Sequence, residues 1–174
     1  MGYAGGRQTD PVYHRMGDHT ETLQVDFDPT RIRYESLLMH FWESHDPTRR
    51  RPTQYKSIVF YHDETQQRQA EASFDRETAR RAEPLHTEIR PFASFYRAED
   101  YHQKYYLRRE IDLLRELKKF YPNNRVMMDA TAAARINGYL AGCGDRQILV
   151  RHGNRLGLTP EGLRRLKEVH AWRH

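Results

Sequence analysis

The chain has 174 residues, a length suited to one domain with a single core. Its 37 % hydrophobic and 11 % aromatic residues exclude a disordered chain, no apolar run reaches the length of a membrane span, and the single cysteine, Cys143, excludes a disulfide scaffold. The net charge of +5 comes from basic and acidic residues that alternate along most of the chain, which predicts a mixed surface. Because no basic and apolar leader is present, we expect a soluble, monomeric, cytoplasmic protein.

The first half of the chain alternates between strand-like and helix-like patterns. Residues 1–20 are rich in glycine and have the composition of a loop, and residues 20–27 then alternate in polarity, which predicts a half-buried strand. The apolar side chains on the inward face of that strand are Leu23, Val25 and Phe27. The elements that follow are expected to be a helix, a strand, a helix and a strand weakened by a proline, at residues 33–44, 57–61, 64–83 and 87–92. This alternation predicts a two-layer α/β fold with helices over a sheet.

The second half is helical throughout. From Glu99 the apolar residues keep helical spacing, with Leu107, Ile111, Leu114 and Leu117 on one face, until Pro122 ends the helix. Two further helices are expected, one over residues 130–140 and one that opens at Thr159 and Pro160. The sequence therefore predicts an α/β domain over residues 1–121 and a helical extension over residues 122–174, packed on the same domain.

Glu21 is the most informative residue of the predicted strand. Strand side chains alternate between faces, so Glu21 shares the inward face with Leu23 and Val25. Burial favours the protonated form of a carboxyl group, which makes Glu21 a candidate general acid. The alternative is that Glu21 lies at the end of the strand and reaches solvent or an arginine. Tyr13 and the run FYRAEDYHQKYY at residues 95–106 add hydroxyl donors that could hold a polar oxygen, or could simply lie at the edge of a core.

Together these segments resemble the A-type peptide methionine sulfoxide reductases. The resemblance extends over residues 2 to about 107, in the order and spacing of that family. The matching segments are GYAGG (2–6), PVYHRMGDHTE (11–21), VDFDP (25–29), YESLLMHFWESHDP (34–47), QYKSIVFYHDETQ (54–66) and FYRAEDYHQKYYL (95–107). The tail, with ATAAARINGYLAGCG and GLTPEG, is similar to the longer C-terminal extension of some members.

The resemblance implies a thiol-dependent oxidoreductase that reduces methionine S-sulfoxide, free or in oxidised proteins, and so repairs oxidative damage. In the family a cysteine thiolate attacks the sulfoxide sulfur while a glutamate and two tyrosines handle the oxygen. Glu21 matches the proton-donating glutamate, Tyr13 and Tyr105 match the two tyrosines, and Asp100 matches an aspartate that binds substrate or water. No bound cofactor or metal is implied, and the reductant is thioredoxin, or dithiothreitol in the laboratory.

The sequence departs from the family at its nucleophile. Family members carry a strand, a Gly-Cys-Phe-Trp turn and a helix before the GYAGG segment, and this sequence does not contain them. Cys143 lies in the tail, where members place cysteines that resolve the oxidised nucleophile, so it is either a resolving cysteine or an inert buried one. The chain is therefore expected to be an N-terminally shortened reductase, with the alternative that it is a catalytically dead remnant that at most binds sulfoxide-containing peptides.

The fold implied by the resemblance is a two-layer α/β sandwich with a mixed sheet, a ferredoxin-like reductase core, without its first strand and helix and with a helical C-terminal extension. Because the missing strand lies inside the family's sheet, we expect a damaged sheet with unpaired strand edges.

Three other functions are weaker. DFDPT at residues 26–30 is similar to a phosphatase nucleophile loop, but the strand before it alternates instead of being fully apolar. His19 and Glu21 match the first half of a zinc-deaminase motif whose cysteine half is absent. Arg49–Arg51 and the arginine-rich late helices could serve a nucleic-acid module, yet no nucleic-acid motif accompanies them. We therefore expect no metal, nucleic-acid or membrane partner.

Overall fold

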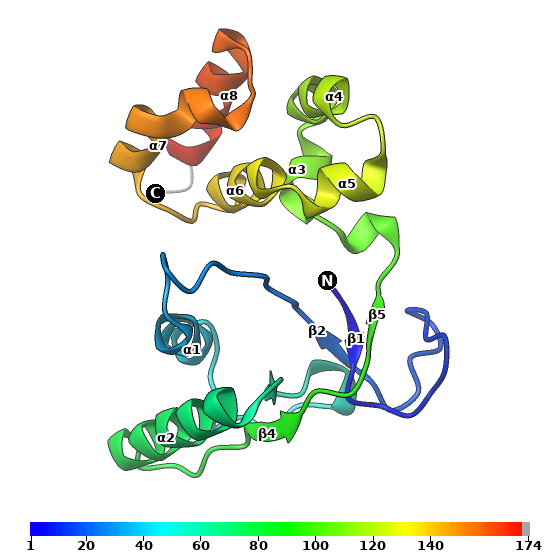
Figure 1. The fold of residues 1–174 in the computed structure, drawn as a ribbon, viewed down its shortest axis with the longest axis vertical. Helices are drawn as coiled ribbons and strands as arrows, with labels where there is room; N and C mark the ends of the chain where they lie inside the picture. The colour runs from blue at the N-terminus through cyan, green and yellow to red at the C-terminus, as the bar shows by residue number, and fades with distance from the viewer. Residues whose placement is uncertain (172–174) are drawn as a thin grey trace. The chain divides into compact units, whose positions relative to one another are not determined.

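The computed structural model describes residues 1–171. The chain divides into two compact units, an α/β unit over Met1–Glu99 and a helical unit that begins at Asp100 (Figure 1). The division falls at residues 99 and 100, whereas the sequence suggested residue 121 as the end of the α/β domain. The predicted α/β class is confirmed, and its strands form two small sheets.

The α/β unit contains a three-stranded antiparallel sheet, and its central strand was not predicted from the sequence. Strand β1, Gly2–Ala4, lies between β2, Thr20–Thr22, and β5, Phe95–Arg97. All three residues of β1 are buried, and a Cβ atom on Gly2 would collide with the Phe95 ring and the Tyr96 carbonyl oxygen. The loop expected over residues 1–20 is therefore wrong for residues 2–4, which form a strand. Gly2 has no Cβ atom, and this lets the strand pass close to β5.

The strand expected over residues 20–27 ends early. Only Thr20–Thr22 pairs with β1, which is itself three residues long and has no more backbone groups to offer. Beyond that point the side chains expected in the core are largely in solvent, with Leu23 72 % and Val25 51 % exposed. The alternating pattern predicted a strand at the correct place but made it too long, because pattern alone does not supply a pairing partner.

A second, parallel pair of strands completes the α/β unit. Strand β3, Ile58–Tyr61, is followed by helix α2, Glu64–Arg80, and by β4, Glu88–Pro91, so the three form a β-α-β crossover. Helix α1, Tyr34–Glu43, packs on α2, and the two share a core in which Trp42 Nε1 donates to Ser73 Oγ at 3.0 Å. The core residues under these helices are Leu38, Val59 and Ala70. These four elements agree with the sequence prediction within a few residues at their ends.

The helical unit is built from short helices around one larger core (Figure 1). Its α-helices are α3 Tyr105–Arg109, α4 Ile111–Phe120, α5 Asn124–Asp129, α6 Thr131–Leu140, α7 Arg146–His152 and α8 Pro160–Ala171. The 3-10 helix η2, Asp100–His102, precedes α3, and a second one, η3, Gly153–Leu156, lies between α7 and α8. Thr159 caps α8 as expected, since its Oγ1 accepts the Gly162 backbone N–H at 3.1 Å. No helix within residues 1–171 is long and apolar enough to cross a membrane.

The single helix expected up to Tyr121 is broken at Glu110. The backbone of Glu110 leaves the helical region, with φ −102° and ψ 80°, and separates α3 from α4. The break rotates the buried face, so that Leu113 enters the core while Ile111, expected there, is 58 % exposed. Helices α5 and α7 were not predicted; each begins at a side-chain cap, Asn123 and Asp145, and is too short for a periodic signal.

Candidate active site

Glu21 lies on an aromatic face of the antiparallel sheet. In the sheet register Glu21 stands opposite Tyr3, and Tyr3 stands opposite Tyr96. Directly paired residues project to the same side of a sheet, so the three side chains share one face. That face carries the buried cluster of Tyr3, Met16 and Ala98. The face predicted by strand alternation is therefore correct, while Glu21 itself is half-buried because β2 is an edge strand.

A short 3-10 helix, η1, covers the Glu21 side chain. Helix η1 spans Thr53–Tyr55 and is tied to β2 by two hydrogen bonds. The Thr20 hydroxyl donates to the Thr53 carbonyl oxygen at 2.8 Å, and the Gln54 amide donates to Glu21 Oε1 at 2.7 Å. These bonds hold a carboxyl group, an amide and the adjacent Tyr55 ring at one place on the sheet.

Tyr55 brings a second hydroxyl to the same place. Hydrogen bonding to the Tyr13 side chain is the main reason that the pKa of the Tyr55 hydroxyl lies above its usual range, and desolvation and the charge of Glu21 act in the same direction. A raised pKa means that the phenol keeps its proton and remains a hydrogen-bond donor. Glu21 and Tyr13, both predicted from the sequence, are thus brought together through Gln54 and Tyr55, which were not.

Glu99 also holds the segment that carries Tyr13, through the Tyr13 backbone. Its carboxylate accepts the Tyr13 backbone N–H at 2.9 Å and the Tyr3 hydroxyl at 2.6 Å. The carboxylate therefore ties the loop that carries Tyr13 to the central strand β1 and to the end of β5. Neither Gln54 nor Glu99 gave a sequence signal, because each stands in a polar stretch without periodicity, and only the fold shows what each one contacts.

His19 is a structural residue. It is buried, its Nδ1 accepts the Gly6 backbone N–H at 3.1 Å, and its Nε2 lies 2.8 Å from the Gln8 carbonyl oxygen. An N–H can only donate and a carbonyl oxygen can only accept, so the ring is neutral with its proton on Nε2. Both ring nitrogens are used by backbone groups. Within residues 1–171 no group of His, Cys, Asp or Glu side chains could hold a metal ion.

Asp18 closes the loop next to His19. Its Oδ1 accepts the Arg7 backbone N–H at 2.8 Å and that of Gln8 at 3.3 Å. The hydrogen bond from Arg7 is the main reason that the pKa of Asp18 lies below its usual range. Asp18 and His19 therefore hold the segment after β1 against the segment before β2, and the loop between them carries Tyr13.

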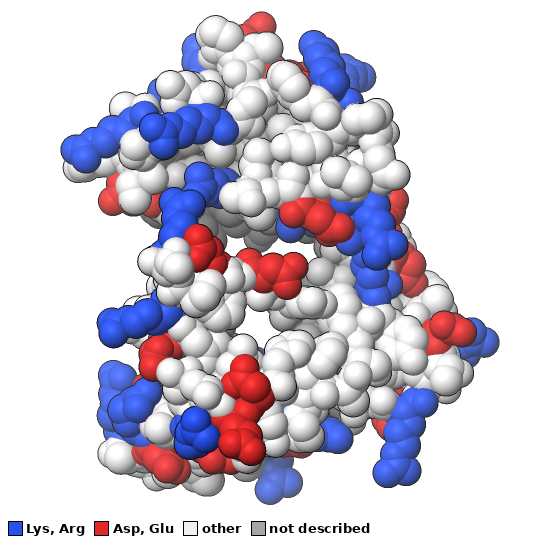
Figure 2. Space-filling view, viewed as in Figure 1, with Lys and Arg blue, Asp and Glu red and all other residues white. Residues whose placement is uncertain are grey.

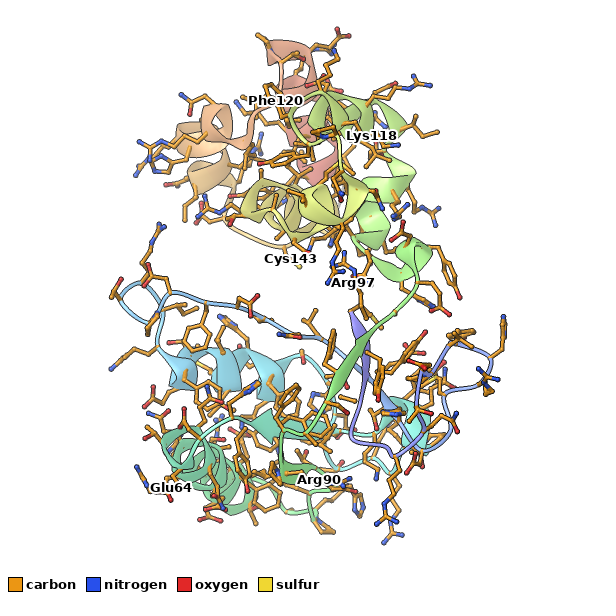
Figure 3. All side chains as sticks on the ribbon, turned by 45° about the vertical axis from the view of Figure 1, so that its right-hand side comes forward. Glu64, Arg90, Arg97, Lys118, Phe120 and Cys143 are labelled. Atoms are coloured by element: carbon orange, nitrogen blue, oxygen red, sulfur yellow. The ribbon has the colours of Figure 1, made fainter. Side chains whose placement is uncertain are left out.

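The other three predicted site residues belong to the helical unit. Asp100, in η2, accepts the Asn124 amide at 2.6 Å and lies 3.9 Å from Arg108. Tyr105, at the start of α3, accepts a hydrogen bond from Arg109 at 2.7 Å, and the same guanidinium stacks over its ring at 5.4 Å. Cys143 is a free, exposed cysteine after α6 (Figure 3). Among the described residues no hydrogen bond or ion pair joins these three to one another.

The position of Cys143 is fixed by the way α6 ends. Gly142 has φ +84° and donates to the Tyr139 carbonyl oxygen at 3.0 Å, while the Cys143 N–H donates to that of Gly138 at 2.8 Å. This pair of bonds is the Schellman motif, in which a left-handed glycine reverses the chain. The cysteine is therefore held by its backbone while its side chain points to solvent, and the inert buried cysteine considered above is wrong.

Comparisons with known proteins agree on one family. The family model for peptide methionine sulfoxide reductase matches residues 1–129. A peptide methionine sulfoxide reductase of Drosophila melanogaster is 42 % identical over 166 residues, which are 92 % of this chain and 65 % of the relative. Peptide methionine sulfoxide reductase A5 of Oryza sativa subsp. japonica is 38 % identical over 148 residues, 81 % of this chain and 58 % of the relative. Peptide methionine sulfoxide reductase MsrA of Acidobacterium capsulatum is 43 % identical over 116 residues, which are 60 % of this chain and 74 % of the relative. The chain thus spans less than two thirds of the length of the first two of these relatives.

Proposed function

Because this chain belongs to the peptide methionine sulfoxide reductase family, we propose that it binds the S-sulfoxide of methionine, free or in oxidised proteins, and that it returns the sulfoxide to methionine when the nucleophilic cysteine of the family's Gly-Cys-Phe-Trp segment is joined to it. The observation that carries the proposal is the group formed by Glu21, Gln54, Tyr13 and Tyr55 on the aromatic face of the sheet. We refer to these four residues as the oxygen site.

The oxygen site has the groups that a sulfoxide oxygen needs. Reduction of a sulfoxide adds two electrons and two protons, and the oxygen leaves as water. Tyr13 and Tyr55 are hydrogen-bonded to each other, so one hydroxyl of the pair donates to its neighbour and the other donates to that oxygen, while the Glu21 carboxyl group delivers a proton to it. Gln54 keeps the carboxyl group in place through its bond of 2.7 Å.

The electrons require a thiol, and the sequence holds one cysteine. We propose that Cys143 is a recycling cysteine for the nucleophilic cysteine of the family's Gly-Cys-Phe-Trp segment. Its thiol would displace water from the oxidised nucleophile to form a disulfide, and thioredoxin or dithiothreitol would then reduce that disulfide and supply the two electrons. The exposed side chain of Cys143 supports this role. The second candidate function is binding without turnover: the oxygen site holds a sulfoxide while this chain supplies no attacking thiolate. Asp100 and Tyr105 stay predictions from the family resemblance. We also retain a cytoplasmic location, with no bound cofactor, as part of the proposal.

The test is turnover of methionine S-sulfoxide with dithiothreitol. The proteins compared are the chain, its Cys143→Ser variant, and a version lengthened before Met1 by a family segment that contains the Gly-Cys-Phe-Trp turn. We expect turnover in the lengthened version and, in the chain itself, binding of the S-sulfoxide detected by NMR. Turnover by the chain that Cys143→Ser abolishes would instead identify Cys143 as the nucleophile.

The R-sulfoxide is the matched control, since a site built around one oxygen position should distinguish the two epimers. A chain that binds neither epimer, together with a lengthened version that shows no turnover, would contradict the assignment of the oxygen site.

A further inference from the structure

The helical unit contains an open groove that the oxygen site does not use. It has a volume of about 670 Å³ and lies where α5, the start of α6 and η3 meet, beside the residue that follows α4. The residues on which the argument depends are Tyr121, Val126, Asp129, Arg135, Arg155 and Leu156. All of them belong to the unit that begins at Asp100, so the groove is complete within that unit.

The groove carries two arginines without partners among the described residues. Arg135 comes from the first turns of α6 and Arg155 from η3, and neither forms a hydrogen bond or ion pair with any residue of the described chain. By contrast, Arg164 and Arg165 of α8 are paired with carboxylates. Asp129, the acidic residue of the lining, already has an interaction partner. The groove therefore has positive charge that residues 1–171 do not neutralise by a hydrogen bond or ion pair.

The backbone adds to this charge at the same place. Helix α6 begins in the lining, at Ala130 and Thr131, and its cap residue, Ala130, has no side chain that could accept a hydrogen bond from the first turn. The free N–H groups of a ten-residue helix carry a partial positive charge and favour an anion. Two guanidinium groups and these N–H groups line one groove, which suits a carboxylate in particular because arginine binds carboxylates through paired hydrogen bonds.

The lining also has an apolar part. Val126 is 57 % exposed and Tyr121 is half-buried, and both line the groove above the buried Leu156. A ligand with only negative charge would leave these side chains in water, whereas an acidic residue next to an apolar one would cover both parts. The groove is also too small for a nucleic-acid track, which needs a long row of phosphate contacts.

Charge across the whole unit favours an acidic partner. Residues 100–174 contain 15 Lys and Arg against 8 Asp and Glu, whereas residues 1–99 contain 14 against 16. Figure 2 shows Lys and Arg side chains projecting from several places on the helical unit. A surface of one sign steers partners of the opposite sign toward it.

We propose that this groove binds an acidic peptide segment of a partner protein, with an Asp or Glu carboxylate between Arg135 and Arg155 and a neighbouring apolar side chain against Val126 and Tyr121. The inference does not rest on the proposed reductase activity, because it concerns binding in the helical unit alone. It adds to the protein a docking function that a sulfoxide site does not require.

The experiment measures fluorescence anisotropy with a labelled peptide that alternates glutamate and leucine, and with a matched peptide in which glutamine replaces every glutamate. The groove variant combines Arg135→Gln and Arg155→Gln. The control variant combines Lys118→Gln and Arg151→Gln, which remove the same two charges from exposed positions outside the groove lining. We expect the groove variant and the glutamine peptide each to weaken binding about tenfold or more, and the control variant to change it less than about twofold.

Two outcomes would overturn the proposal. Equal loss in the groove and control variants would mean that general charge, not the groove, attracts the peptide. A mixed-sequence single-stranded oligonucleotide that binds more tightly than the peptide, and loses affinity in the groove variant, would assign the groove to nucleic acid.

NMR provides a second measurement that does not depend on any variant. The amide signals of Thr131 and Ala132 should shift on addition of the glutamate peptide, and unshifted signals would contradict the role of the α6 N-terminus.

Discussion

Glu21 and Tyr13 in the α/β unit are held differently from Tyr105 in the helical unit. In the α/β unit, Glu21 is bonded to a residue 33 positions away, and the Tyr13 backbone to one 86 positions away. In the helical unit, the Tyr105 hydroxyl is bonded to Arg109, four positions along the same helix. Tyr55 and Tyr105 are almost equally exposed, at 53 % and 52 %, so exposure does not separate them. What separates them is whether distant parts of the chain converge on the side chain, and convergence is what a reaction site needs.

The largest losses of stability are expected from substitutions in the two cores, and the loss should be greater in the helical unit than in the α/β unit. Leu117→Ala removes a fully buried side chain from the large core of the helical unit and should cost about 2–5 kcal/mol. Leu38→Ala, in the smaller core of the α/β unit, should lie near the lower end of that range, because a core with fewer buried neighbours can collapse around the cavity. Urea unfolding followed by circular dichroism measures both. A greater loss for Leu38→Ala would reverse our ranking of the cores.

Glu21→Gln is expected to reduce turnover of methionine S-sulfoxide about a hundredfold or more, because it removes a proton donor and retains the shape of the side chain. The measurement uses the form of the protein that shows turnover in the assay above. Glu43→Gln, at an exposed position at the end of α1, is the matched control and should leave turnover unchanged. Equal rates for the Glu21 variant and the control would remove Glu21 from the mechanism.

The tyrosines give the most direct test of the comparison. Tyr13→Phe and Tyr55→Phe should each lower turnover about tenfold, since each breaks the hydrogen-bonded pair that presents a hydroxyl to the sulfoxide oxygen. Tyr105→Phe should change turnover less than about twofold, because Tyr105 is not one of the four residues of the oxygen site and its hydroxyl serves as acceptor for Arg109 on its own helix. If Tyr105→Phe has the larger effect, the family resemblance identifies the second tyrosine better than the hydrogen bonds of the α/β unit do.

The smallest effect is expected at Asp18. Because hydrogen bonding lowers the pKa of Asp18 in the folded protein, its contribution to stability is present above the ordinary pKa of about 3.9 and disappears as the pH falls through the lowered value. The free energy of unfolding of Asp18→Asn should therefore approach that of the wild type as the solution becomes more acidic. Asp75→Asn, at an exposed position of α2, serves as control and should show no such convergence.

The sequence predicted the elements that carry their own signals. Helix α1 has apolar residues at helical spacing, and α8 has its Thr-Pro opening, so both were found. Strand β1 was missed because three residues that begin with glycine have no period, and their strand conformation depends on β2 and β5 on either side. The break at Glu110 was missed for the opposite reason, since the apolar spacing continues across it.

The candidate site likewise contains some residues that the sequence predicted and others that only the structure shows. The side on which Glu21 lies follows from alternation along one strand, which is local information. The partnership of Glu21 with Gln54, and the bonds of Glu99 to Tyr3 and to the Tyr13 backbone, arise only when segments far apart in the chain meet. A single sequence does not contain that information in any periodic form, which is why Gln54, Tyr55 and Glu99 came from the structure alone.

The turn that ends α6 also makes the protein easy to study by chemical labelling. Cys143 is the only cysteine of the sequence and is exposed, so one maleimide dye attaches at one known position. Ten residues of helix separate that end of α6 from the end that opens in the groove, a distance of roughly 15 Å. A donor dye at Cys143 and an acceptor dye on the acidic peptide would therefore report docking by energy transfer in a protein that needs no engineered attachment site.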